Sequence, residues 1–170
     1  MLFRSMLRLD PDARPQLSVF DRLIDLRPDQ KQEVPPHRLQ AIRQYKDAVM
    51  RDLEWLLNSR ANTDEVGEAF PELRSSSYTY GLPDFSTLVL TSGPDKLKLS
   101  RGIQQAIELH EPRLTNVTVE VPENPEKKVA LEMKLKFTVN ATLLMSPSPE
   151  QVSFDTELEL GRGSYQVKGG

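Results

Sequence analysis

Apolar residues recur at helical spacing in three segments of the chain. The first, Leu17 to Leu26, is short and carries one apolar stripe: Val19, Phe20, Leu23 and Ile24. The second runs from about His37 to Ser59 and repeats apolar residues at three- and four-residue steps: Leu39, Ile42, Val49, Leu53, Leu56 and Leu57. The third begins at Ser92-Gly93-Pro94-Asp95, with an inward stripe of Leu97, Ile103, Ala106, Ile107 and His110. We therefore predict three helices.

The pattern changes to period two after Glu111. Alternating apolar positions define a first strand and then a long one: Val117, Val119 and Val121, then Val129, Leu131, Met133, Leu135, Phe137, Val139, Ala141 and Leu143. A third strand has Val152, Phe154, Leu158 and Leu160, with Thr156 as the exception, and Tyr165 with Val167 adds a short last one. Such alternation is typical of a sheet with one buried face. The predicted fold class is α+β, with N-terminal helices packed on a C-terminal antiparallel β-meander.

The length of the chain, 170 residues, suits one ordinary domain, which we place at residues 16–170. Residues 1–15 are interpreted as an N-terminal extension that could be flexible. Its apolar residues stop at Asp10-Pro11, before a segment of signal-peptide length has formed. No run approaches the ~20 apolar residues of a membrane span. The sequence therefore indicates a cytoplasmic protein without direct membrane insertion.

Charge and aromatic residues argue against nucleic acid as a partner. The 22 basic and 25 acidic residues give a net charge of -3, and no basic block stands out, whereas phosphate binding needs a concentrated basic face. Tyr78 and Tyr80 flank a bend enforced by Gly81 and Pro83. Such a pair is more typical of core packing in an ordered loop than of base stacking.

Candidate catalytic and metal-ligating residues are few. The chain has no cysteine, and its two histidines, His37 and His110, lie in no recognisable motif. His110, near a predicted helix C-terminus, is best explained by a favourable dipole contact when charged. The sequence therefore predicts no catalytic residue, no metal site and no cofactor.

The tripeptide Glu111-Pro112-Arg113 is the most informative stretch. Pro112 lacks an N–H and pushes Glu111 out of the helical region, so the segment should be extended. Residues two apart in an extended segment point the same way. We therefore expect the Glu111 carboxylate and the Arg113 guanidinium to lie on one side of the chain, where they pair or meet one partner together. A plain structural ion pair is the simpler interpretation of the tripeptide alone.

Four stretches in this order resemble the TssE family, the small baseplate subunits of bacterial type VI secretion systems, which are related to a wedge component of contractile-phage baseplates once labelled lysozyme-like. They are Ser18-Val19-Phe20-Asp21-Arg22-Leu23-Ile24-Asp25, Arg51-Asp52-Leu53-Glu54-Trp55-Leu56-Leu57-Asn58-Ser59-Arg60, Ser77-Tyr78-Thr79-Tyr80-Gly81-Leu82-Pro83-Asp84-Phe85, and Glu111-Pro112-Arg113-Leu114. With the strand alternation, the resemblance covers about Gln16 to Val167. The early segment, with Pro28 after it, looks more like the secretion version than the phage one.

The resemblance implies a non-enzymatic subunit in a baseplate docked at the inner membrane. The family's Glu-Pro-Arg motif, here Glu111, Pro112 and Arg113, is taken as the contact to the wedge core. The implied partners are the wedge proteins TssF and TssG, with TssK as a further candidate, and the sheath proteins TssB and TssC. The alternatives are the equivalent wedge protein of a contractile phage tail or tailocin and, on the old family label alone, a peptidoglycan hydrolase. A neighbouring arginine lowers the pKa of a carboxylate, whereas a general acid needs a raised one, so the tripeptide does not favour hydrolysis.

The sheet is similar to the strand-exchange region of tail-sheath subunits, and a sheet edge can accept a strand from another chain. The segment Val152 to Leu160 contains neither proline nor lysine, which are the residues that usually protect an edge. We therefore predict that this strand is the pairing edge, unless it is central or covered by Met1 to Pro15. Its outward residues Ser153, Asp155 and Glu157 are predicted partner-binding positions.

Overall fold

The computed structural model describes residues 15–24, 28–29, 37–62, 70–85, 92–122, 134–146, 148–159 and 163–169. The elements follow in the order α1 (Val19–Leu23), α2 (Arg38–Asn58), η1 (Pro71–Ser75), η2 (Ser77–Thr79), α3 (Gly93–His110), β1 (Leu114–Glu120), β2 (Lys134–Leu143), β3 (Glu150–Glu159) and β4 (Ser164–Gly169). The predicted α+β class is confirmed. The expected N-terminal extension up to Arg14, the first part of the long strand at Val129 and the residue Leu160 lie outside the described residues.

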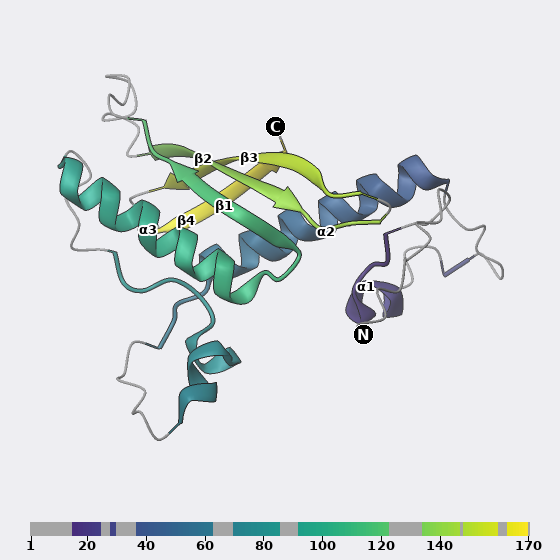
Figure 1. Ribbon diagram of the computed structural model, residues 1–170, viewed down its shortest axis with the longest axis horizontal. Helices are drawn as coiled ribbons and strands as arrows, with labels where there is room; N and C mark the ends of the chain where they lie inside the picture. The colour runs from purple at the N-terminus through teal and green to yellow at the C-terminus, as the bar shows by residue number, and fades with distance from the viewer. Residues whose placement is uncertain are drawn as a thin grey trace, which may run out of the picture.

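The four strands form one antiparallel sheet in the order β1-β2-β3-β4, so each strand pairs with its neighbours in the sequence. Figure 1 shows α2 and α3 on one side of this sheet, with α3 along β1 and α2 along β4. The alternating apolar residues of the strands face these helices and are buried with them in a single core. The outer face carries the polar residues of the same alternation, as one-sided burial requires.

Helix α2 supplies the largest part of the helical layer. It begins where the His37 main-chain N–H donates to Oε1 of Gln40, at 3.2 Å. Its buried residues are Ala41, Tyr45, Ala48, Val49, Leu53, Leu56 and Leu57. Leu39, which the sequence placed in the apolar stripe, is 73% exposed because it lies in the first turn, before α2 meets the sheet.

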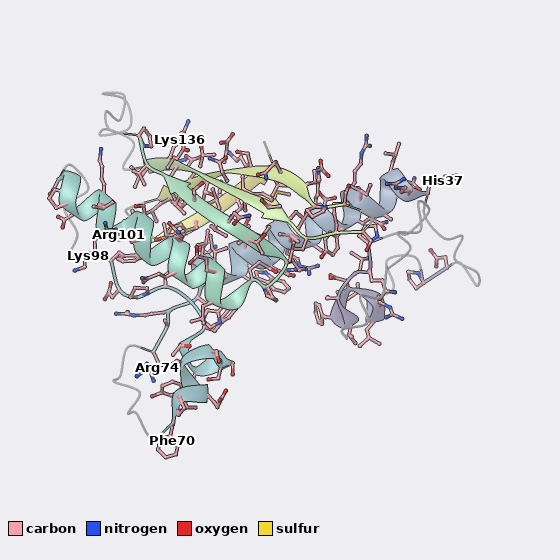
Figure 2. All side chains as sticks on the ribbon, viewed as in Figure 1. His37, Phe70, Arg74, Lys98, Arg101 and Lys136 are labelled. Carbon is pink, nitrogen blue, oxygen red and sulfur yellow. The ribbon has the colours of Figure 1, made fainter. Side chains whose placement is uncertain are left out.

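The predicted ordered loop between α2 and α3 is confirmed at Tyr78 to Phe85. Gly81 has a φ of +120°, and a side chain there would meet the main chain of Ser59. The Tyr80 ring packs edge-on against His110, whose Nε2 lies 3.0 Å from the Thr79 carbonyl. Tyr80 therefore packs on the core as expected, whereas Tyr78 is 42% exposed. The η1 and η2 turns project away from the sheet, with Phe70 at their far end (Figure 2).

Strand β1 contains a β-bulge, which lets two residues an odd number of positions apart both face the core. Leu114 and Val117 are both buried, which simple alternation forbids. The register with β2 shifts between Thr115 and Thr118, so one extra residue is inserted. Asn116 takes it up with a φ of 52°, a left-handed conformation that asparagine tolerates better than most residues.

The prediction that Val152 to Leu160 is an edge strand is wrong. Residues Phe154 to Glu159 pair with β4 on one side and with β2 on the other. The sequence misled because the absence of lysine and proline fits a central strand as well as an open edge. Within the part of the chain that the structure describes, the outer strands of the sheet are β1 and β4.

Thr156, the exception in the predicted alternation, lies inside the core. It is 2% exposed, and its hydroxyl has no hydrogen-bond partner among the described residues. Its neighbours across the sheet are Phe137 and Val167, both apolar. The core therefore carries one polar atom that no described group satisfies, a destabilising arrangement.

Candidate functional site

The predicted motif forms a tight corner between α3 and β1. The Glu111 N–H donates to the Ile107 carbonyl at 2.8 Å, and the Leu114 N–H donates to the Glu111 carbonyl at 3.1 Å. Glu111 caps α3 with a φ of -120° and a ψ of 82°, outside the helical region, as expected of a residue before proline. The prediction that this segment is extended is wrong, because Pro112 and Arg113 form a turn closed by the bond from the Leu114 N–H to the Glu111 carbonyl. The corner is thus fixed by main-chain bonds on both sides of Pro112, which is exposed.

The carboxylate of Glu111 and the guanidinium of Arg113 pair with each other. Nε of Arg113 donates to Oε1 at 2.6 Å and Nη2 donates to Oε2 at 2.5 Å, the two-pronged geometry that arginine forms with carboxylates. The Arg113 main-chain N–H also donates to Oε1, at 3.2 Å. The expectation that both side chains lie on one side of the chain is therefore confirmed, in the form of an internal pair.

This pair belongs to a larger ion network of five residues, Asp21, Arg51, Asp52, Glu111 and Arg113. Nη2 of Arg113 lies 2.6 Å from Oδ2 of Asp52, whose Oδ1 lies 2.7 Å from Nη2 of Arg51. Nη1 of Arg51 in turn lies 2.6 Å from Oδ1 of Asp21. Carboxylates and guanidiniums alternate along the whole series. The ion network therefore joins α1, α2 and the α3–β1 corner.

Burial differs along the ion network. The side chains of Glu111 and Asp21 are 6% and 7% exposed, whereas that of Arg51 is 34% exposed. Burial lowers the pKa of Arg113, but the hydrogen bonds that its guanidinium donates to Glu111 and Asp52 outweigh it and raise that pKa above its ordinary value. Burial raises the pKa of Asp21, but the hydrogen bonds from Arg51 and Ser18 hold it below its ordinary value. Both groups therefore keep their charges.

Aromatic rings support the two arginines. The guanidinium of Arg113 lies 6.0 Å from the ring centre of Tyr45, and that of Arg51 lies 4.8 Å from the ring centre of Trp55. The Phe20 ring of α1 packs edge-on against Trp55, with the ring centres 6.3 Å apart. Helix α1 is therefore attached to α2 by the Asp21 ion pair and by an aromatic contact.

The apolar stripe predicted for the first helix is exposed on α1. Val19 and Leu23 are 72% and 78% exposed, and Phe20 is 55% exposed. Trp55 of α2 is also half exposed. Figure 1 shows α1 outside the layer that α2 and α3 form against the sheet. The ion network thus connects α1, with its exposed apolar side chains, to the α3–β1 corner through Arg51 and Asp52. Monomeric proteins rarely expose large contiguous apolar patches.

Ser153, Asp155 and Glu157 lie elsewhere, on the outer face of β3. Asp155 accepts a hydrogen bond from the Thr138 hydroxyl at 3.2 Å. Glu157 lies 3.0 Å from Nζ of Lys134 and 3.6 Å from Nζ of Lys168. The structure therefore does not bring these residues together with Glu111, Pro112 and Arg113. Their role as partner-binding positions stays a prediction.

Sequence reasoning missed the roles of Asp21, Arg51 and Asp52. Each stands in a stretch that carried the family resemblance, but nothing in the sequence couples Asp52 to Arg113, 61 positions away. The local signal that the sequence offers is the adjacent Arg51-Asp52 pair on the longest helix, but charge patterning on a helix does not identify a distant partner.

The described residues contain no group of three or more histidine, aspartate or glutamate side chains placed to hold a metal ion. Among them, no helix has the length and apolar character needed to cross a membrane. The site consists of an ion network whose charges pair with one another and of exposed apolar side chains on α1. Such an arrangement suits contact with another protein.

Comparison with known proteins agrees with this description. The family model for baseplate wedge protein gp25 matches residues 43–148, which include α2 from Arg43 onward, the loop, α3, the corner and the first two strands. No curated protein matches the chain.

Proposed function

Because the chain belongs to the baseplate wedge protein gp25 family, we propose that it is a non-enzymatic structural subunit of a type VI secretion baseplate. In this proposal it links the wedge core, made of TssF and TssG and in contact with TssK, to the first ring of the TssB/TssC sheath. It works in the cytoplasm, in a baseplate docked at the inner membrane. The family supports a structural role in a phage-tail-like baseplate, and the more specific assignment rests on the Asp21-Arg22-Leu23 segment followed by Pro28.

The main support for the proposed contact with the wedge core is the ion network around Arg113. It connects the corner that carries the exposed Pro112 and the Arg113 side chain, 20% exposed, to α1 and its exposed apolar side chains. Glu111 acts through Arg113, because both of its oxygens already accept hydrogen bonds from that guanidinium. A corner with its charges paired internally can meet a partner without leaving a charge unpaired. We propose that Glu111, Pro112 and Arg113 bind the wedge core in this way.

Co-purification tests this contact. The tagged protein should retain TssF and TssG, and Arg113→Ala should reduce their recovery strongly. Arg60→Ala is the matched control, since Arg60 forms an ion pair with Asp84 but its side chain is 74% exposed. For each variant, the recovery of TssF and TssG is compared with its melting temperature. Normal recovery of TssF and TssG with a much lower melting temperature would make the motif an internal support and reject it as the partner contact.

The absence of catalysis is part of the proposal, and the paired state of Glu111 supports it. A general acid has to present its proton to a substrate, whereas this carboxylate is 6% exposed and bound on both oxygens. Purified cell walls should therefore keep their turbidity when the protein is added. Clearing above a heat-inactivated control, abolished by Glu111→Gln, would contradict the structural role.

The sheath contact is proposed to be main-chain pairing at an outer strand of the sheet. The supporting observation is that the sheet is open, with β1 and β4 as its outer strands in the described residues. An outer strand presents unpaired N–H and C=O groups that another chain's strand can satisfy. A sheath that assembles normally on baseplates lacking this subunit would contradict the proposal.

A further inference from the structure

The outer side of β4 is occupied by side chains of α2. The Tyr165 N–H donates to Oδ1 of Asn58 at 2.9 Å, and Nδ2 of Asn58 donates to the Tyr165 carbonyl at 2.9 Å. The Val167 N–H donates to Oε2 of Glu54 at 3.3 Å. One amide side chain thus makes the same pair of bonds that a residue of a neighbouring strand would make.

The α2 residues that do this stand four positions apart and therefore on one ridge of the helix. Met50 continues the ridge, and its sulfur is the nearest atom to a side chain built at Gly169, at 3.8 Å. The ridge thus runs along β4 from Tyr165 to its end. Covering an edge with a helix is one of the ways in which proteins prevent strand addition.

The opposite side of the sheet differs. The Leu144 N–H donates to the Arg113 carbonyl, so the even-numbered residues of β2 turn their main-chain groups toward β1. Thr118 and Glu120 pair with Asn140 and Thr138, two such even-numbered residues, and therefore point back to β2. Val119 between them turns its N–H and C=O outward.

No side chain of the described residues donates to or accepts from the main chain of Val119 as Asn58 does for Tyr165. The bulge at Asn116 breaks the regular edge on one side of it. At Pro122, Nζ of Lys96 donates to the carbonyl at 3.0 Å. Among the described residues, the part of the β1 edge without a partner therefore lies between Val117 and Val121.

We infer that the sheet accepts a strand on one side: α2 closes the β4 edge with Glu54 and Asn58, and the β1 edge at Val119 pairs with an extended strand of another chain. The inference rests on the proposed sheath contact only for the identity of that chain. Exchanging main-chain hydrogen bonds with an open edge requires an extended segment, whatever its sequence. The bulge limits the added strand to the second half of β1.

Hydrogen exchange in the free protein tests the asymmetry without any partner. The amide of Val119 should exchange quickly, and those of Tyr165 and Val167 slowly, because a protein group already accepts from each of the latter. Replacing both Glu54 and Asn58 by alanine should speed exchange at Tyr165 and Val167 and leave Val119 unchanged. Slow exchange at Val119 in the free protein would overturn the inference.

A matched pair of substitutions tests where the strand is added. Val119→Pro and Val167→Pro each remove one outward N–H from an outer strand, a position at which proline is tolerated. Val119→Pro should weaken binding of purified TssB/TssC sheath by about tenfold or more, and Val167→Pro should leave it within about twofold. Circular dichroism checks that both variants fold, and exchange at Val119 on sheath addition gives the same answer with the unaltered protein.

The experiments distinguish a wrong choice of edge from a wrong sheath contact. Sheath binding that Val167→Pro abolishes and Val119→Pro leaves intact would overturn the choice of edge while leaving the sheath contact standing. An unaltered protein that binds no sheath would reject the sheath contact, and the exchange rates in the free protein would still decide which edge is open.

Discussion

Two clusters of opposite charges differ in what surrounds them. The ion network around Arg113 is shielded by α1, α2 and Tyr45, and its Glu111 side chain is 6% exposed. The cluster of Glu157 with Lys134 and Lys168 lies on the open outer face of the sheet, where the Lys168 side chain is 65% exposed. Both clusters hold a carboxylate between or beside cations at contact distance.

The difference shows that burial and connectivity, rather than the number of ion pairs, decide what such a cluster does. An exposed pair is screened by water and contributes little to stability. A buried charge that loses its partner is destabilising, so each member of the shielded cluster depends on the others. The network around Arg113 therefore couples three segments of the chain, whereas the Glu157 cluster joins neighbouring strands that already pair through their main chains.

Arg113→Ala should give the largest effect. It leaves the buried carboxylate of Glu111 without its guanidinium, a loss that typically lowers the free energy of unfolding by about 3–5 kcal/mol. Chemical denaturation followed by circular dichroism measures it, with Arg60→Ala as the control for loss of an exposed arginine. A destabilisation no larger than that of Arg60→Ala would mean that burial does not distinguish the two kinds of pair.

Glu111→Ala should cost less than Arg113→Ala. The guanidinium of Arg113 keeps Asp52 as a partner at 2.6 Å, so a destabilisation of about 1–3 kcal/mol is expected. The same denaturation experiment measures it, and the double variant Glu111→Ala with Arg113→Ala gives the coupling between the two side chains. Equal losses from both single variants would show that Asp52 does not support Arg113.

The strand alternation and the two long helices could be predicted from the sequence because each reports a local periodicity. The position of β3 could not, since a central strand and an edge strand of a one-sided sheet have the same alternation. The bulge at Asn116 was foreseeable only from the odd spacing of Leu114 and Val117, which the valine alternation obscured. In the candidate site, opposite charges two positions apart predicted the pairing of Glu111 with Arg113, but the structure brings them together through a turn and not through an extended segment. Their contact with Asp52 depends on how α2 packs beside the corner.

Acid should weaken the attachment of α1 by a smaller amount. The pKa of Asp21 is held below its ordinary value of 3.8, so its stabilising contribution is complete above that pH and is lost as the pH falls through the lower folded-state pKa. Because Arg51 is partly exposed, we expect no more than about 1 kcal/mol. Thermal melts from pH 6 to pH 3 should show the unaltered protein and Asp21→Asn converging below pH 3.8. A difference that is independent of pH would exclude the carboxylate charge as the cause.

Glu157→Gln should have the smallest effect on stability, no more than about 0.5 kcal/mol. Its ion pairs with Lys134 and Lys168 lower its pKa, but they lie on a face open to water. Urea denaturation at low and high salt measures the contribution, which salt should remove. A loss comparable to that of Glu111→Ala would abolish the contrast between the two clusters.

The order of the strands has a consequence for synthesis. Each strand pairs with the one before it, so the sheet can extend hairpin by hairpin as the chain leaves the ribosome. The contact between Asn58 and Tyr165 joins residues 107 positions apart and forms only when β4 has emerged. Until then the side of β3 that faces away from β2 is unpaired, and Glu54 and Asn58 lack the β4 main-chain groups that they bind in the folded protein. The nascent chain is therefore most exposed to faulty strand pairing in the interval between the synthesis of β3 and that of β4.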